Sequence, residues 1–263
     1  KGYKVSIIQC VSHNDNDDRC FTLFTKVQLE ELAEHCKGML AVGISVLTTH
    51  YLNRAIQVND YLRKSIKVPI VWGGVPVICD PGFYLNCADF VCTGEGEIFM
   101  EEFLGNVQKN EPLNKTRGIA YRSVNGEIIR TTPIPLIDVN NIPIPIFNLD
   151  EHYILGKHLV SLREDPNELI KQTIRRGYRV FPIRGCPFKC SFCCNNKLTE
   201  VFKGQKLLRT RRTDLVIEEL LKAKEMIPEM NIVWFEEDDF FSRTDEELEN
   251  LMKMYKKDID LPI

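Results

Sequence analysis

Short apolar runs alternate with segments of helical periodicity through the first third of the chain. The runs Lys4–Cys10, Leu40–Leu47 and Val68–Gly74 are continuously apolar enough to predict buried strands. Between them, Lys26–Gly38 and Tyr51–Ser65 carry apolar residues at helical spacing. Strands that alternate with helices of this length favour a parallel sheet, because right-handed crossovers return the chain to the same sheet edge.

The same pattern continues into a further strand, Ala88–Gly94, and an amphipathic helix, Glu95–Val107. After the helix, Arg117–Arg130 centres on Asn125-Gly126, a pair favoured in tight two-residue hairpins. The pattern therefore predicts an α/β fold. We expect residues 1–130 to form a doubly wound, Rossmann-like domain with an appended hairpin.

A proline-rich segment follows the predicted hairpin. Thr131–Asp150 contains four prolines and almost no helical pattern. Proline removes backbone donors and fixes φ, so the segment is expected to be an extended linker. We place the linker at residues 131–170 and begin a second domain at residue 171.

The second predicted domain, residues 171–263, contains two strand-helix units. Tyr178–Gly185 predicts a strand that runs into a cysteine-rich loop, and Thr213–Met226 predicts a helix with its glutamates facing outward. Asn231–Phe240 predicts a buried strand ending in acidic residues, and Thr244–Lys257 predicts another helix.

Composition narrows the class of protein. The chain has 263 residues, 44% hydrophobic and 27% charged, which is typical of a globular protein with a core. A net charge of -3 gives no general attraction to nucleic acid or anionic membranes. No apolar run has the length of a membrane span and no signal peptide is evident, so we expect a cytoplasmic protein with reduced thiols. The chain starts at Lys1 rather than methionine, and we interpret it as part of a longer polypeptide.

Four of the ten cysteines lie between Cys186 and Cys194. In a reduced compartment such clustering indicates metal binding or catalysis rather than disulfides. Cys186, Cys190 and Cys193 have the spacing C-x3-C-x2-C, and three thiolates from one loop can hold one face of an iron-sulfur cluster. Structural zinc, or plain buried cysteines, is the less favoured alternative, because zinc sites usually use two separated ligand pairs and no second pair follows.

This spacing, with Phe192 before the last cysteine, resembles the signature of the radical S-adenosylmethionine (radical SAM) superfamily. The resemblance implies that Cys186, Cys190 and Cys193 ligate a 4Fe-4S cluster and that Phe192 lies beside the adenine of S-adenosylmethionine. It also implies reductive cleavage of S-adenosylmethionine to a 5'-deoxyadenosyl radical. For the fold, it implies that residues 171–263 are the first part of a TIM-like (β/α) barrel, since two strand-helix units cannot close a barrel.

Acidic residues end the strand that follows, in the stretch Phe235–Asp239. The resemblance implies that Glu237 and Asp238 hold the methionyl amino group of S-adenosylmethionine, and a cationic amine beside carboxylates is electrostatically favourable. An acidic strand end that only caps the next helix is the alternative. Arg211 matches an arginine common in relatives, although a solvated basic turn explains it almost as well.

The front domain resembles the cobalamin-binding domain of one group of radical SAM enzymes. Doubly wound sheets bind ligands at carboxyl strand ends, where glycine permits close approach. The stretch after the first strand lacks the Asp-x-His-x-x-Gly pattern of many cobalamin domains, so His13 is interpreted as a loop histidine rather than an axial ligand. The cobalamin contacts that the resemblance implies are Ser45, Leu47, Gly73, Gly74, Thr93, Gly94 and Glu95.

The function that follows from this resemblance is cobalamin-dependent radical methyl transfer to a substrate carbon. The alternatives are a radical cyclase or rearrangement enzyme, a methylthiotransferase-like enzyme, and a non-catalytic corrinoid or metal-binding module. Expected partners are a small-molecule or peptide substrate and an electron donor such as flavodoxin or ferredoxin. No catalytic side chain is assigned. Methylthiotransferases hold a second cluster with three N-terminal cysteines, whereas the remaining cysteines here are scattered and are expected to be small buried residues: Cys10, Cys20, Cys36, Cys79, Cys87 and Cys92.

Overall fold

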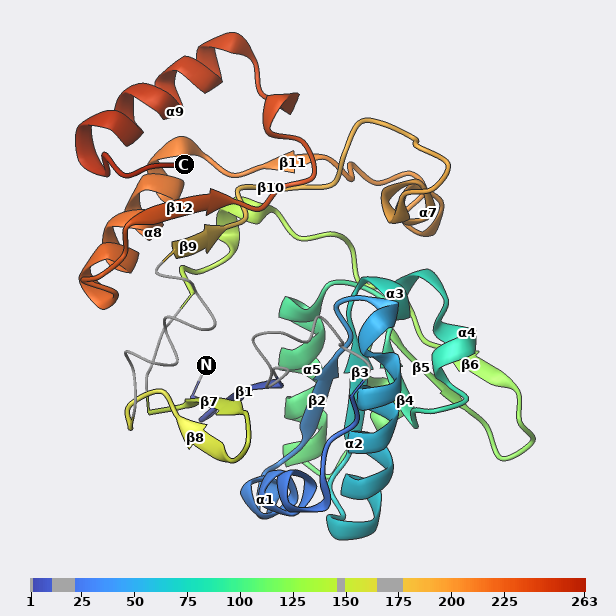
Figure 1. Ribbon diagram of the computed structural model, residues 1–263. Helices are drawn as coiled ribbons and strands as arrows, with labels where there is room; N and C mark the ends of the chain where they lie inside the picture. The colour runs from blue at the N-terminus through green and yellow to red at the C-terminus, as the bar shows by residue number, and fades with distance from the viewer. Residues whose placement is uncertain (1, 11–21, 146–149, 165–176) are drawn as a thin grey trace.

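The structure is a computed structural model that describes residues 2–10, 22–145, 150–164 and 177–263 (Figure 1). His13 and Cys20 lie outside the described residues. In the part of the chain that is described, no helix is both long and apolar enough to cross a membrane.

A five-stranded sheet, called here the front sheet, has the strand order β2-β3-β4-β5-β6. Its first three strands are parallel, and β5 and β6 are added antiparallel. The strands are β2 (Val42–Ser45), β3 (Ile70–Gly73), β4 (Phe90–Cys92), β5 (Ile119–Arg122) and β6 (Ile128–Arg130). The alternation of strands and helices predicted between Lys26 and Val107 is therefore confirmed.

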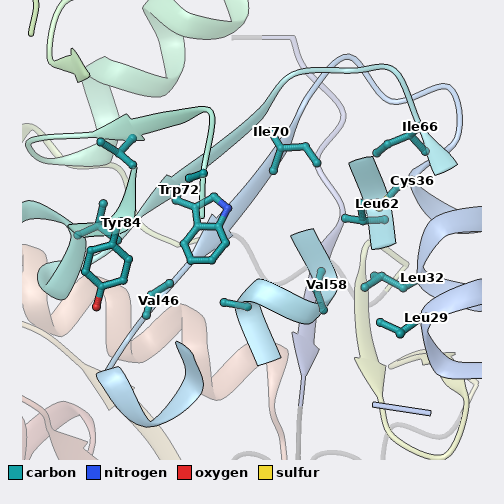
Figure 2. Packing of buried hydrophobic residues seen from close by; sticks show 14 of the residues in the cluster. Leu29, Leu32, Cys36, Val46, Val58, Leu62, Ile66, Ile70, Trp72 and Tyr84 are labelled. Carbon is teal, nitrogen blue, oxygen red and sulfur yellow. The ribbon is translucent and has the colours of Figure 1, made fainter. Parts of the chain in front are cut away.

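Helices cover both faces of the front sheet because consecutive side chains of a strand point to opposite faces. Trp72 packs in the cluster drawn in Figure 2 with residues of α1 and α2, whereas Val71 packs against Phe99 and Phe103 of α5. The helices are α1 (Lys26–Cys36), α2 (Leu52–Ser65), α3 (Val75–Cys79), α4 (Pro81–Tyr84) and α5 (Gly96–Gln108). Short 3-10 turns are at Thr49–Tyr51, Leu113–Lys115, Val139–Asn141 and Phe240–Ser242.

The hairpin predicted around Asn125-Gly126 exists, but its loop has a different length. The Ser123 carbonyl accepts from Gly126 N–H at 2.9 Å, and the Ser123 N–H donates to the Glu127 carbonyl at 2.8 Å. Gly126 has a φ of 82°. This is a turn followed by a left-handed glycine bulge, the arrangement of three-residue hairpin loops, so the expected two-residue turn is wrong.

The first strand is not a buried strand of the front sheet. β1 (Ile7–Cys10) pairs in parallel with β7 (His152–Leu155), which pairs antiparallel with β8 (Leu159–Ser161). β1 is largely exposed, and Cys10 is exposed with it. An apolar run can satisfy its backbone at any available strand edge, and here a hairpin within the range predicted as linker provides that edge. Among the other cysteines predicted to be buried, Cys36 and Cys92 are buried, and Cys79 and Cys87 are half-buried.

The strand predicted at Tyr178–Gly185 is divided into β9 (Gly177–Val180) and β10 (Ile183–Arg184). Pro182, which lacks an N–H donor, lies at the break. β9 pairs in parallel with β12 (Ile232–Phe235), and β10 pairs antiparallel with β11 (Arg209–Thr210). The strand predicted at Asn231–Phe240 therefore ends earlier than expected, at Phe235.

Helices α8 (Thr213–Met226) and α9 (Asp245–Asp258) bury one face of the β9–β12 pair. Val180 and Val233 contribute to that core. Thr244 caps α9 through a capping box with Glu247, which explains why this helix begins where the sequence predicted. A shorter helix, α7 (Cys194–Val201), follows the cysteine-rich loop and packs against α3 of the front sheet.

Candidate functional site

The carboxyl ends of β2 and β3 approach each other closely, and glycine permits the approach. Gly74 has a φ of 109°, which strains side chains of L-residues. A Cβ at Gly74 would lie 2.2 Å from the Val46 carbonyl oxygen. Gly73 is less confined, since its Cβ would meet Cys92 Cβ at 3.8 Å. Gly73 and Gly74, called here the glycine edge, were predicted to permit close approach. The steric need for glycine is clear at Gly74.

A cavity of about 610 Å³ opens beside this glycine edge. Its volume is in the range of small-molecule sites, roughly 300–1,000 Å³. The residues that line it come from two regions far apart in the sequence. Ser45, Gly73, Gly74 and Gly94 come from the front sheet, and Arg184, Cys194, Asn195 and Asp238 come from the segments around the cysteine-rich loop and β12.

The residues expected to contact cobalamin divide into two groups. Five of them line the cavity: Ser45, Gly73, Gly74, Gly94 and Glu95. Leu47 and Thr93 are not among the lining residues. Leu47 is 72% exposed, and the Thr93 hydroxyl donates to the Gly118 carbonyl at 3.0 Å. Leu47 and Thr93 therefore lie outside the cavity wall.

The cysteine loop, residues 185–193, connects β10 to α7. The Cys193 N–H donates to the Cys190 carbonyl at 3.0 Å, which places the two residues in one turn. Cys190 is exposed, Cys186 and Cys193 are half-buried, and all described cysteines are free thiols. Within the described residues, no three histidine, cysteine or acidic side chains are gathered closely enough to hold a metal ion. The loop thus brings the three predicted cysteines onto one short segment without gathering their side chains.

Glycine also fixes the start of the cysteine loop. Gly185 has a φ of 84°, and a Cβ there would lie 2.5 Å from the Leu207 carbonyl oxygen. The loop therefore leaves β10 in a left-handed turn directly against the residues that lead into β11. Cys194, which follows the predicted ligands, is the first residue of α7 and lines the cavity.

The acidic residues after β12 have different surroundings. Glu237 receives two hydrogen bonds from Arg243, at 2.6 and 2.8 Å, and the two side chains are 1% and 4% exposed. Asp238 is exposed and lines the cavity. Phe192, the residue expected beside adenine, is 91% exposed and is not part of the cavity wall. Of the three predicted S-adenosylmethionine contacts, only Asp238 faces the cavity.

Arg211 is buried rather than solvated. Its guanidinium donates to Glu219 at 3.1 Å and to the Ile142 carbonyl at 3.1 Å. Glu219 also accepts from the Tyr178 hydroxyl at 2.9 Å, so the expectation that the glutamates of this helix face outward is wrong for Glu219. Burial raises the pKa of Glu219, although Tyr178 and Arg211 oppose the shift. A basic turn in solvent no longer explains Arg211.

The sequence interpretation missed an ion-pair network at the cavity wall. The Arg209 guanidinium makes a bidentate pair with the Glu95 carboxylate, at 2.8 and 2.9 Å, and Arg184 reaches Glu95 at 3.0 Å and Glu97 at 2.5 Å. Burial alone would raise the pKa of Glu95, but hydrogen bonds from Arg209, the Ile137 N–H and Arg184 lower it below its ordinary value. Glu95 and Arg209 are 114 residues apart, and no local sequence pattern relates them.

The chain has a mixed α/β fold similar to that of cobalamin-dependent radical SAM enzymes. The fold matches the radical SAM methyltransferase TsrM from Kitasatospora setae, bound to tryptophan and a SAM analogue, with a TM-score of 0.62 and 14% identity over 87% of this chain and 42% of that chain. It also matches OxsB, a cobalamin-dependent radical enzyme bound to aqua-cobalamin and S-adenosylmethionine, with a TM-score of 0.60 and 14% identity over 97% of this chain and 37% of that one.

The chain is also similar in sequence to curated proteins named as a cyclase and a methyltransferase. The anaerobic magnesium-protoporphyrin IX monomethyl ester cyclase of Synechocystis is 28% identical over 63% of this chain and 31% of its own length. An uncharacterized methyltransferase of Pyrococcus horikoshii is 28% identical over 68% of this chain and 35% of its own length. The chain thus spans about a third of the length of these relatives, and no family model matches it. The fold likeness that the sequence resemblance implied is therefore confirmed.

Proposed function

We propose that this chain carries the cofactor-binding part of a cobalamin-dependent radical SAM enzyme that transfers a methyl group to a substrate carbon. In this proposal, residues 1–130 are a Rossmann-like cobalamin domain, residues 131–170 are a linker that contributes the β7–β8 hairpin paired with β1, and residues 171–263 are the start of a TIM-like barrel. The parallel β9–β12 pair joined through α8 supports the barrel assignment. The parallel strands β2, β3 and β4, with helices on both faces, support the Rossmann-like assignment.

One observation carries the proposal: the glycine edge of the front sheet and the segment beside the cysteine loop line the same cavity. A corrinoid at the carboxyl ends of β2 and β3 would therefore lie next to a cofactor held at the loop. Group transfer between two cofactors needs their reacting atoms held in a fixed geometry, and a shared cavity provides the space for it.

The residues of the cysteine loop fit a 4Fe-4S cluster in their donor chemistry. Thiolates are the usual ligands of such clusters, and Cys186, Cys190 and Cys193 supply three from one short loop. Ligation would draw these side chains together, as metal binding often completes a site that is open beforehand. Cys194 starts α7 and is not assigned as a ligand.

The front sheet fits a large planar cofactor at its glycine edge. We assign Ser45, Gly73, Gly74 and Gly94 to cobalamin, because they line the cavity and offer little side-chain bulk. Leu47 and Thr93 lie close to these residues in the sequence but do not line the cavity, so no contact with cobalamin is proposed for them. When bound, the cluster supplies the electron that cleaves S-adenosylmethionine to a 5'-deoxyadenosyl radical, and cobalamin carries the methyl group.

Asp238 is the proposed partner of the methionyl amino group of S-adenosylmethionine. Its exposed carboxylate lines the cavity, whereas the carboxylate of Glu237 is already paired with Arg243. Phe192 is proposed to lie beside adenine, since an exposed aromatic ring within the cysteine loop is free to stack. The reaction would also need an electron donor such as flavodoxin or ferredoxin, and a cytoplasmic location suits reduced thiols.

Radical cyclisation is the second candidate function. The Synechocystis relative is named a cyclase, and the chain matches it over 63% of its own residues. Both reactions would use the same cavity, so they differ in the substrate and not in the cofactor site proposed above.

Anaerobic reconstitution with iron, sulfide and hydroxocobalamin tests the proposal. After desalting, we expect about four irons per chain, as for one 4Fe-4S cluster, together with retained cobalt. Alanine at Cys186, Cys190 or Cys193 should abolish the cluster, whereas the matched variant Cys194→Ala should keep it. Loss of iron from Cys194→Ala would overturn the ligand assignment, and iron without cobalt would overturn the cobalamin assignment.

A further inference from the structure

The network around Glu95 joins three parts of the chain that are distant in sequence. Glu95 follows β4 and precedes α5 of the front sheet, and its Oε2 accepts from the Ile137 N–H at 3.0 Å. Arg209 in β11 donates to both Glu95 oxygens and to the Ile137 carbonyl at 2.7 Å. The front sheet, the proline-rich segment and the β10–β11 ribbon therefore meet at one carboxylate.

The arginines come from facing positions of one ribbon. Arg184 of β10 and Arg209 of β11 are cross-strand partners, and both guanidinium groups reach Glu95. Gly185 follows Arg184 directly and begins the cysteine loop. The position of the cysteine loop is thus tied, through one residue of β10, to the edge of the front sheet.

The ion pairs of this network are better suited to fixing the relative orientation of the segments they join than to adding stability. Side chains of Glu95 and Arg209 are 16% and 11% exposed, so the pair is largely shielded from solvent. Buried ion pairs contribute little net stability compared with apolar contacts, but the planar guanidinium fork fixes distance and angle together. Glu95 and Arg209 also line the cavity, so the geometry they fix is that of the cavity walls.

We propose that Arg209, acting through Glu95, is a positioning residue that sets the separation between the glycine edge and the cysteine loop. The inference rests on the proposed function only in assuming that this separation matters for two cofactors. The contact between Arg209 and Glu95 exists without them. It also replaces the expected role of Glu95: its carboxylate binds the two arginines instead of cobalamin.

A distance measurement tests the proposal without any cofactor. Spin labels on bioorthogonal residues at Asn125 and Lys253, both exposed, would report the separation of the β5–β6 loop from α9 by pulsed electron paramagnetic resonance. We expect a single narrow distance distribution in the parent chain. Arg209→Lys keeps the charge but loses the fork, and should broaden the distribution and shift its mean.

The matched control is Arg212→Lys, because Arg212 pairs with Asp214 at the surface, where the two side chains are 63% and 56% exposed. This control should leave the distribution unchanged. Glu95→Gln is the second variant and should reproduce the broadening. An unchanged distribution in both Arg209→Lys and Glu95→Gln, or a lower melting temperature alone, would overturn the positioning role.

The same variants separate this inference from the proposed function. Iron and cobalt contents after reconstitution test the cofactors, and the label distances test the positioning. Failure of the parent chain to retain cobalt would remove the proposed function and leave the distance result standing. Retained cofactors with unchanged distances would remove the inference alone.

Discussion

The two strand-end edges that face the cavity are built on opposite principles. At the ends of β2 and β3 the wall includes three small uncharged residues, Ser45, Gly73 and Gly74, and its other members there are apolar. Beyond β12 the chain carries a run of acidic residues, and its two glutamates are paired with arginines: Glu236 with Arg179, and Glu237 with Arg243. The first edge carries small residues beside the cavity, and at the second edge the exposed carboxylate of Asp238 lines the cavity with no ion pair to any described residue.

This contrast explains which edge could be interpreted from sequence. A glycine acts through its own backbone, so its role is visible locally. An acidic residue acts according to its partners, and the partner of Glu237 was not predicted. Variants can test whether the first edge depends on the absence of side chains, and whether the second depends on which acidic residues form ion pairs.

The largest effect is expected at Gly74. In Gly74→Ala the added Cβ would lie only 2.2 Å from the Val46 carbonyl oxygen, which is a steric clash. The φ of this residue also disfavours any side chain. We expect the free energy of unfolding to fall by about 4 kcal/mol, as measured by urea denaturation. Gly94→Ala is the control on the same cavity wall, since nothing lies within 4 Å of its Cβ and its φ is not positive. Equal losses in the two variants would refute the steric account.

A smaller loss is expected when the buried pair at the acidic edge is broken. Arg243→Met leaves the carboxylate of Glu237 buried without its partner and should lower the free energy of unfolding by about 3 kcal/mol. Arg179→Met, at the more exposed pair with Glu236, should cost about 0.5 kcal/mol or less. Chemical denaturation of both variants at neutral pH measures the difference. A loss for Arg179→Met as large as that for Arg243→Met would show that burial does not distinguish the two pairs.

Glu95, between the two edges, should give a pH-dependent effect. Its pKa is lowered in the folded chain, so its stabilising contribution is present above the unfolded-state pKa, about 4.3, and is lost as pH falls through the lower folded value. We expect Glu95→Gln to be less stable than the parent by about 2 kcal/mol at pH 7. Urea titrations at decreasing pH should show the difference shrinking below about pH 4. A difference that grows with acidity would contradict the sign.

The fold and the site were predictable to different degrees. The periodicity of Lys26–Gly38 and Tyr51–Ser65 predicted two helices, since the signal lies in the segment itself. The Lys4–Cys10 run was placed in the wrong sheet, because an apolar strand does not encode its partner, and β7 enters the chain much later. Likewise Gly74 could be identified from sequence, whereas the pairing of Glu95 with Arg209 depends on contacts across 114 residues.

The smallest effect on stability is expected at Asp238, where the change should appear in binding. Its carboxylate is exposed at the cavity wall, so Asp238→Asn should alter the free energy of unfolding by less than about 0.5 kcal/mol. If this carboxylate holds the methionyl amino group, the affinity for S-adenosylmethionine in the reconstituted protein should fall about tenfold, a loss of about 1.4 kcal/mol. Isothermal titration of the parent and the variant measures it. Glu236→Gln is the matched control, since Glu236 also lines the cavity but is paired with Arg179. A tenfold loss in the control with none in Asp238→Asn would move the amino-group contact to Glu236, and pairing would no longer decide which acid is available.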